Sequence, residues 1–123
     1  MNLKHNALTK QIIHAYFEIY NRVGFGFEKS VYKNGLVAFL RSTHQLHIEV
    51  DKMTKIFLEM DYLGEVFVDL VVENNVLVHI TADDRLLEKE LKRLHSFLKH
   101  SDCTVGLLLN FGIQTEFKRI EIP

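Results

Sequence analysis

Residues 64–81 read GEVFVDLVVENNVLVHIT, which is two apolar runs joined by the short polar segment Glu73-Asn74-Asn75. Both runs are rich in β-branched residues, so this stretch predicts two adjacent strands joined by a tight turn. Asp69 is a single carboxylate in the middle of the first run. A carboxylate buried there must be paired, protonated or bound to a metal ion. The second run should supply the partner groups, and it offers His79 and Thr81.

The rest of the composition is typical of one globular domain covering residues 1–123. The chain is 47% hydrophobic and 25% charged, values that are ordinary for a protein with a hydrophobic core. The net charge of -1 gives no global basic field for nucleic acid, although it allows a local basic face. One cysteine excludes an intramolecular disulfide. The first ten residues lack a signal-like apolar segment, and no run is long enough to span a bilayer. We therefore expect a cytoplasmic protein without a membrane partner.

The periodicity of apolar residues predicts an α/β fold in the order α-α-β-β-β-β-α-β-β. Helices are expected at residues 5–23, 28–42 and 85–100, the last one capped by Asp83 or Asp84. Strands are expected at residues 47–50, 55–60, 65–72, 76–80, 104–110 and 117–122, with turns at residues 62–64 and 73–75. Asn75 is expected to be the left-handed residue of the second turn. A helix between two strands indicates a crossover, and so a mixed sheet with helices on its faces.

Four segments in this order resemble the bacterial GxxExxY proteins of the PD-(D/E)XK nuclease-like superfamily. They are residues 24–32 (GFGFEKSVY), 64–73 (GEVFVDLVVE), 105–112 (VGLLLNFG) and 118–120 (KRI). The resemblance covers nearly the whole chain and implies a restriction-endonuclease-like mixed β-sheet flanked by helices. It also implies that Asp69 is the acid of the superfamily's metal site and that Glu18 matches an acid on its first helix.

The chain departs from the family pattern at the positions that carry the chemistry. Counted from Gly26, Tyr32 fits the name of the family, but Lys29 stands where the Glu is expected. The superfamily's Glu-x-Lys falls at His79-x-Thr81, so both of its members are replaced. Arg93 stands where the family often has a Gln on the third helix.

These replacements bear on whether the protein can cleave nucleic acid with the help of a metal ion. Mg²⁺ prefers hard oxygen ligands, whereas imidazole suits softer metals, and threonine supplies no charge. Our first hypothesis is therefore a degenerate, catalytically inactive nuclease-like protein, with Asp69, His79, Thr81 and Glu18 at the ancestral site positions. On this interpretation Asp69 is a hydrogen-bonded structural acid, and His79 is a sheet histidine with satisfied ring nitrogens.

Two alternatives stay open. A metal-dependent nuclease with a rebuilt site would bind Mn²⁺ or Mg²⁺ through Asp69 and His79, with help from Glu18 and Glu73. Lys29 or Lys52 would then supply the missing positive charge from another element. A protein-interaction module would instead form a homo-oligomer by pairing the edge strand at residues 117–122 between subunits.

The third predicted helix carries a basic face. Lys89, Lys92, Arg93 and Lys99 lie off its leucine stripe. Such a face can follow the phosphate backbone of DNA or RNA. The competing interpretation is a solvated helix surface that Glu88 and Glu90 partly neutralise.

Overall fold

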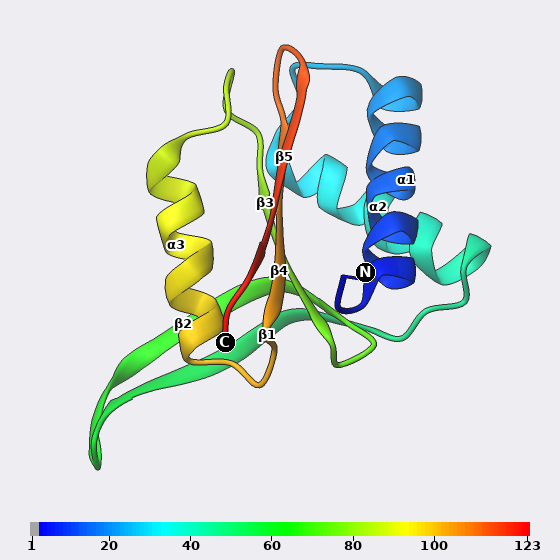
Figure 1. Cartoon of the computed structure of the whole chain (residues 1–123). Coiled ribbons are helices and arrows are strands. Elements are labelled where there is room, and N and C mark those ends of the chain that lie inside the picture. The colour runs from blue at the N-terminus through cyan, green and yellow to red at the C-terminus, as the bar shows by residue number, and fades with distance from the viewer. Residues whose placement is uncertain (1–2) are drawn as a thin grey trace.

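A computed structural model describes residues 3–123 as three helices and five strands (Figure 1). In chain order they are α1 (Asn6–Val23), α2 (Lys29–Thr43), β1 (Ile48–Leu58), β2 (Asp61–Val72), β3 (Val76–Thr81), α3 (Glu88–Lys99), β4 (Val105–Phe111) and β5 (Thr115–Glu121). The α/β class and the succession of elements are as predicted, with one difference. The strands expected at residues 47–50 and 55–60 are a single strand, β1, because a left-handed residue, Asp51, is accommodated without ending it.

The five strands form one mixed sheet in the order β1-β2-β3-β4-β5. Only β3 and β4 are parallel, and α3 is the crossover between them. The other neighbours are antiparallel. The sheet stands between α1 and α2 on one side and α3 on the other (Figure 1). This confirms the predicted restriction-endonuclease-like arrangement and places β5 at an edge, as expected.

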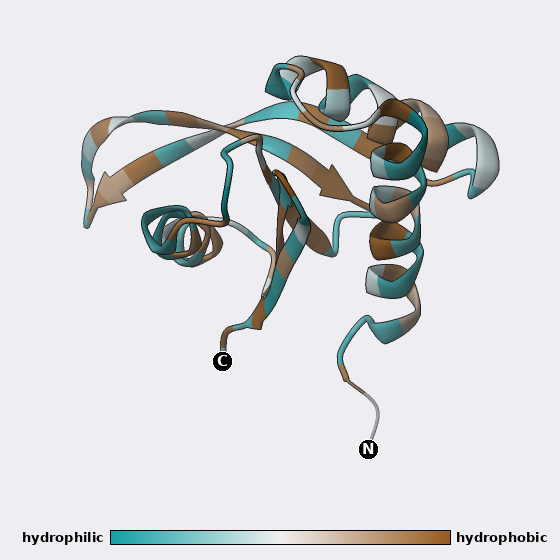
Figure 2. Ribbon diagram, turned by 90° about the horizontal axis from the view of Figure 1, so that it is seen from above, coloured by the Kyte–Doolittle hydropathy of each residue, from teal (hydrophilic) through white to brown (hydrophobic). Residues whose placement is uncertain are grey.

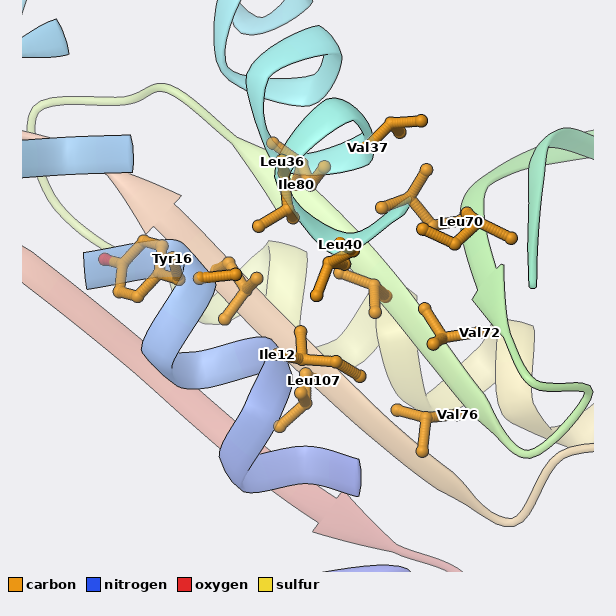
Figure 3. Packing of buried hydrophobic residues seen from close by; sticks show 14 of the residues in the cluster. Ile12, Tyr16, Leu36, Val37, Leu40, Leu70, Val72, Val76, Ile80 and Leu107 are labelled. Atoms are coloured by element: carbon orange, nitrogen blue, oxygen red, sulfur yellow. The ribbon is translucent and has the colours of Figure 1, made fainter. Parts of the chain in front are cut away.

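Two hydrophobic clusters hold the helices to the sheet. The larger one joins α1 and α2 to alternate residues of the central strands, as Figure 3 shows for Ile12, Leu40, Leu70, Ile80 and Leu107. The smaller cluster lies under α3 and includes Leu77, Leu94, Leu98 and Leu108. None of the helices in the described part of the chain is long and apolar enough to cross a membrane.

A glycine sets the distance between α3 and the sheet. A Cβ added to Gly106 on β4 would lie 2.9 Å from Leu94 Cδ1 and 3.0 Å from Leu98 Cδ1. Non-bonded carbon atoms prefer about 3.5–4.0 Å. The absence of a side chain at Gly106 therefore lets α3 approach β4, which also brings the start of α3 close to β3.

The first half of β2 leaves the body of the sheet. The β2–β3 pairing covers only Leu70–Val72 of β2, whereas β1 and β2 stay paired up to Leu58 and Asp61. The two strands thus form an arm that projects past α3, which is seen end-on beside the arm in Figure 2. The predicted turn at residues 62–64 is wrong. The chain reverses at Glu59 and Met60, and Gly64 lies inside β2.

Two smaller predictions at chain reversals are also wrong. In the β2–β3 turn the left-handed residues are Glu73 and Asn74, with φ angles of 52° and 56°, rather than Asn75. Two consecutive left-handed residues match the right-handed twist of a hairpin. Helix α3 begins later than expected, after Leu87, and neither Asp83 nor Asp84 caps it. Asp83 instead donates its backbone N–H to Asn110 Oδ1, which fixes the loop before the helix.

Candidate functional site

The divergence of β2 from β3 creates the site. Regular pairing of β2 and β3 ends at Leu70 and Val78, so the next backbone N–H on β3, that of Ile80, has lost its strand partner. Asp69 Oδ2 accepts that N–H at 2.8 Å. The carboxylate thus replaces a strand carbonyl at the fork, where side chains from both faces of the sheet can reach it.

On the α3 side, His79 lies between two carboxylates. Its Nδ1 is 3.2 Å from Asp69 Oδ2, and its Nε2 is 2.6 Å from Glu90 Oε2. All three residues are buried, with 5–7% of each residue exposed. The ring also packs edge-on against Phe97 of α3. Both ring nitrogens are engaged, and the imidazole links the strand acid to the helix acid.

On the α2 side, two lysines one helical turn apart approach the same carboxylate. Lys29 Nζ is 2.8 Å from Asp69 Oδ1, and Lys33 Nζ is 3.3 Å from the same oxygen. Lys33 also pairs with Asp51 on β1. Because α2 begins at Lys29, both lysines are on its first turns and face the fork between β2 and β3.

These contacts lower the pKa of Asp69, the acid at the centre of the site. Burial by itself opposes the ionisation of Asp69, since it removes water from the carboxylate. The hydrogen bonds from His79 and Lys29 and from the backbone of Ile80 outweigh this cost. Together they hold the pKa of the Asp69 carboxyl well below its usual range.

The pKa of Lys33, the second lysine beside Asp69, shifts upward. Burial disfavours the charged form of Lys33, but hydrogen bonds and attraction from Asp51 and Asp69 prevail and raise its pKa. Asp69 and Lys33 are therefore both charged at neutral pH. The fork holds a set of internal ion pairs.

A pocket of about 560 Å³ opens over this network. It lies between the start of α2 and the start of α3, with the end of β3 as its floor. The cations along its lining are Lys29, Lys89 and Arg93. Arg93 is held by Glu90, with Nη1 3.4 Å from Oε1. Two of the three cations are thus anchored by carboxylates that lie beneath them.

The oxygens in the cluster do not fit a divalent metal. Asp69 Oδ1 faces the two lysines, and Oδ2 faces Ile80 N and His79. In Glu90, one oxygen faces His79 and the other faces Arg93. Within residues 3–123, no group of three or more His, Cys, Asp or Glu side chains is arranged to hold a metal ion. A metal would have to displace protein cations to gain its oxygen ligands.

Thr81, at the position expected for the superfamily's lysine, has a different partner. Its hydroxyl donates to Asn110 Oδ1 at 2.8 Å, and the residue is 7% exposed. Asn110 in turn donates its amide to the carbonyl of Asp83 at 3.0 Å. Thr81 lines the pocket, but its hydrogen bond anchors the loop between β3 and α3.

The remaining predicted site residues lie elsewhere. Glu18 pairs with His14 and Arg22 along α1 and does not line the pocket. Glu73, at the β2–β3 turn, accepts the backbone N–H of His47 at 2.9 Å. Lys52 pairs with Glu49 on its own strand. The structure therefore brings Asp69 and His79 together with Lys29, whereas the predicted acids Glu18 and Glu73 make their contacts elsewhere.

The basic face predicted on α3 is divided. Lys89 and Arg93 line the pocket, while Lys92 and Lys99 do not. Lys92 lies 4.0 Å from Glu88 on the exposed side of the helix, and Lys99 is in its last turn. Two of the four cations of the predicted face, Lys89 and Arg93, therefore border the site.

Sequence reasoning missed three members of the network: Glu90, Lys33 and Asp51. Glu90 precedes Leu94 and Leu98 at intervals of four residues, so its place on the buried side of α3 was readable from the helical period. Lys33 follows Lys29 at the same interval. Asp51 gave no comparable signal, because its approach depends on how β1 curves beside α2.

Comparisons with known proteins agree with this geometry. A model of the PD-(D/E)XK nuclease superfamily matches residues 6–120. The crystal structure of SSO0001 is similar in fold, with a TM-score of 0.60 and 15% sequence identity. That similarity covers 97% of this chain and 61% of the other, so the chain spans less than two thirds of the length of its structural neighbour. No curated protein matches the sequence.

Proposed function

Because the chain belongs to the PD-(D/E)XK nuclease superfamily, we propose that it is a degenerate member that binds nucleic acid at the ancestral cleft without efficient cleavage. The observation that carries this proposal is the contact of 2.8 Å between Lys29 Nζ and Asp69 Oδ1. In the proposal the ammonium group of Lys29 takes the place of the metal ion. Resemblance to the GxxExxY proteins is part of the same proposal, with Lys29 at the position of their Glu.

Loss of cleavage follows from the chemistry of the substituted groups. Metal-assisted hydrolysis of a phosphodiester needs oxygen ligands for the ion, an activated water and stabilisation of the charge that develops on the phosphate. His79 offers neither carboxylate oxygens nor a free ring nitrogen, since both nitrogens face acids. Thr81 has no charge and donates its hydroxyl to Asn110. Each function of the ancestral site is therefore lost or redirected.

Retention of binding is supported by the cations around the pocket. Lys29 and Arg93 each use one contact on a carboxylate and keep further N–H donors, because an ammonium group has three and a guanidinium has five. Their side chains remain 43% and 57% exposed. Lys89 adds a third cation, and the positive end of α2 borders the same space. A phosphate backbone could be held there by protein cations alone.

Nearby acids set the strength of this interaction. Glu28 and Asp83 also line the pocket, so its field is only locally positive. We therefore expect modest affinity with a clear dependence on salt, as for a protein that neutralises a few phosphates. Neither base-specific recognition nor a particular sequence is part of the proposal.

Fluorescence anisotropy in EDTA tests the binding. Labelled single- and double-stranded oligonucleotides are titrated with the protein, Lys29→Met, Arg93→Met and the matched control Lys10→Met, in which the lost lysine is exposed on α1. The two pocket variants should weaken binding severalfold and lower the salt slope by about 1 each, whereas the control should not. Equal behaviour of all three variants, or no binding, would contradict the proposal.

Asp69→Asn separates this proposal from a metal-dependent nuclease with a rebuilt site. In the degenerate protein, removing a negative charge beside the phosphate leaves binding intact or tightens it. In a rebuilt nuclease, Asp69 and His79 are ligands, and the substitution abolishes the heat of Mn²⁺ binding in calorimetry. A metal-binding heat that depends on Asp69 would therefore favour the enzyme.

A further inference from the structure

Within residues 3–123, the outer edge of β1 has no strand partner. The strand runs from Ile48 to Leu58 and pairs with β2 on one side only. Helix α2 contacts the first half of β1 at two points: Arg41 donates to the carbonyl of Ile48, and Lys33 pairs with the side chain of Asp51. No described residue outside β2 hydrogen-bonds to the backbone of residues 49–58. A long open edge of this kind can add a further strand.

The arm that carries this edge is also unusually apolar for a surface. Its exposed side chains include Met53, Phe57, Leu58, Met60, Tyr62 and Phe67, and Met60 is 94% exposed. Figure 2 shows hydrophobic segments recurring along the whole arm. Proteins usually blunt open edges with charges or bulges, and large exposed apolar surfaces mark interaction sites. We propose that a second copy of this chain covers the arm by pairing β1 with β1 in antiparallel orientation.

The order of charges along β1 favours a second copy as the partner. Acidic residues come first, at Glu49 and Asp51, and basic residues follow, at Lys52 and Lys55. In an antiparallel pair the second strand runs in reverse, so Asp51 near the start of one strand can lie opposite Lys55 of the other. The strand is therefore complementary to itself.

The same charges select the register. A two-fold axis between identical antiparallel strands places one residue opposite its own copy. An axis at Lys52 or Lys55 would place two ammonium groups face to face, which is destabilising. An axis at Met53 places Asp51 opposite Lys55 twice, and the side chain of Asp51 is 59% exposed and available to a second cation.

The length of the strand agrees with this register. Because β1 spans Ile48–Leu58, Met53 is its central residue, and an axis there aligns the two strands end to end. Two five-stranded sheets would join into one continuous sheet across the axis. This dimer does not depend on the proposed nucleic-acid binding, because the pocket lies between α2 and α3.

Light scattering with size exclusion tests the dimer and its charges. The protein should have the mass of a dimer, and Lys55→Glu, which places two acids opposite each other, should give a monomer. Asp51→Lys should also be monomeric alone, and mixing the two variants should restore a dimer because both cross-pairs are then complementary. Circular dichroism checks that each variant is folded.

A cross-link tests the register directly and without changing any charge. With oxidised glutathione, Met53→Cys should form a disulfide-linked dimer under native conditions. Ile113→Cys, at a position 59% exposed outside β1, and the unmodified protein, whose Cys103 is 5% exposed, should not. A monomer at all concentrations would overturn the proposal. A dimer that persists in Lys55→Glu and that Met53→Cys does not cross-link would also overturn the proposal. Such a dimer would indicate pairing at the β5 edge instead.

Discussion

Replacing Asp69 by Asn should destabilise the protein if its partners are internal cations. The carboxylate accepts the N–H of Ile80 at 2.8 Å and meets His79 at 3.2 Å and Lys29 at 2.8 Å. An amide of the same shape can still accept from Ile80. The substitution therefore removes mainly the charge, and with it the attraction for the groups around the fork.

The magnitude follows from the exposure of those groups. Losing a hydrogen bond to a charged group costs about 1.5–3 kcal/mol, which applies to the buried contact with His79. Lys29 is 43% exposed and can turn to water, so its contact contributes at most about 1 kcal/mol. Lys33 keeps Asp51 as a partner. We expect a net loss of roughly 2–3 kcal/mol, below the ~3–5 kcal/mol seen when a buried ion is left alone.

Equilibrium unfolding in urea, with EDTA present, measures this difference. The matched control is Asp51→Asn, which removes a carboxylate that also pairs with Lys33 but is 59% exposed, and which should cost less than about 1 kcal/mol. A site built for a metal ion behaves in the opposite way, since its acids repel one another until the ion binds. Greater stability of Asp69→Asn, or a large rise in stability with Mn²⁺, would refute the reasoning.

Three further predictions concern the scaffold and the effect of pH. Tyr32→Phe should lose about 1–2 kcal/mol in urea unfolding, because the buried hydroxyl donates to Gly24 O at 2.6 Å and accepts a backbone N–H at 3.1 Å in the turn before α2. Gly106→Val should cost about 1–3 kcal/mol, measured the same way, because its added carbons meet Leu94. The low pKa of Asp69 means that its stabilisation is present above the unfolded value of about 3.9 and is lost as pH falls below it. Unfolding followed from pH 5 downward should therefore show a slope that Asp69→Asn reduces.

Much of the fold could be predicted from local pattern. The helical stripe through Ile12 and Ile19 and the β-branched runs around Asp69 place α1, β2 and β3 within a few residues. A helix between β3 and β4 indicated the parallel crossover. The errors fall where local preference is weak. Asp51 takes a left-handed conformation inside β1, and Glu59 rather than Gly64 supplies the reversal of the arm.

Half of the candidate site was likewise accessible from the sequence. A carboxylate inside an apolar strand requires a partner, and this reasoning led to Asp69 and His79, which do meet. The sequence proposes Lys29, like Lys52, only as a source of the missing positive charge and does not predict the contact of Lys29 with Asp69. That contact depends on how α2 crosses the sheet, and Glu90 depends on how closely α3 approaches β4. Such distances are set by tertiary packing, which residue spacing does not record.

The most direct test of the central claim is a gel with labelled single- and double-stranded DNA, with EDTA or with Mn²⁺ in separate lanes. If protein cations have replaced the metal, the DNA should shift equally in both and remain intact, and Lys29→Met should weaken the shift. Cleavage that requires Mn²⁺ and disappears in Asp69→Asn would contradict the account and show a working nuclease.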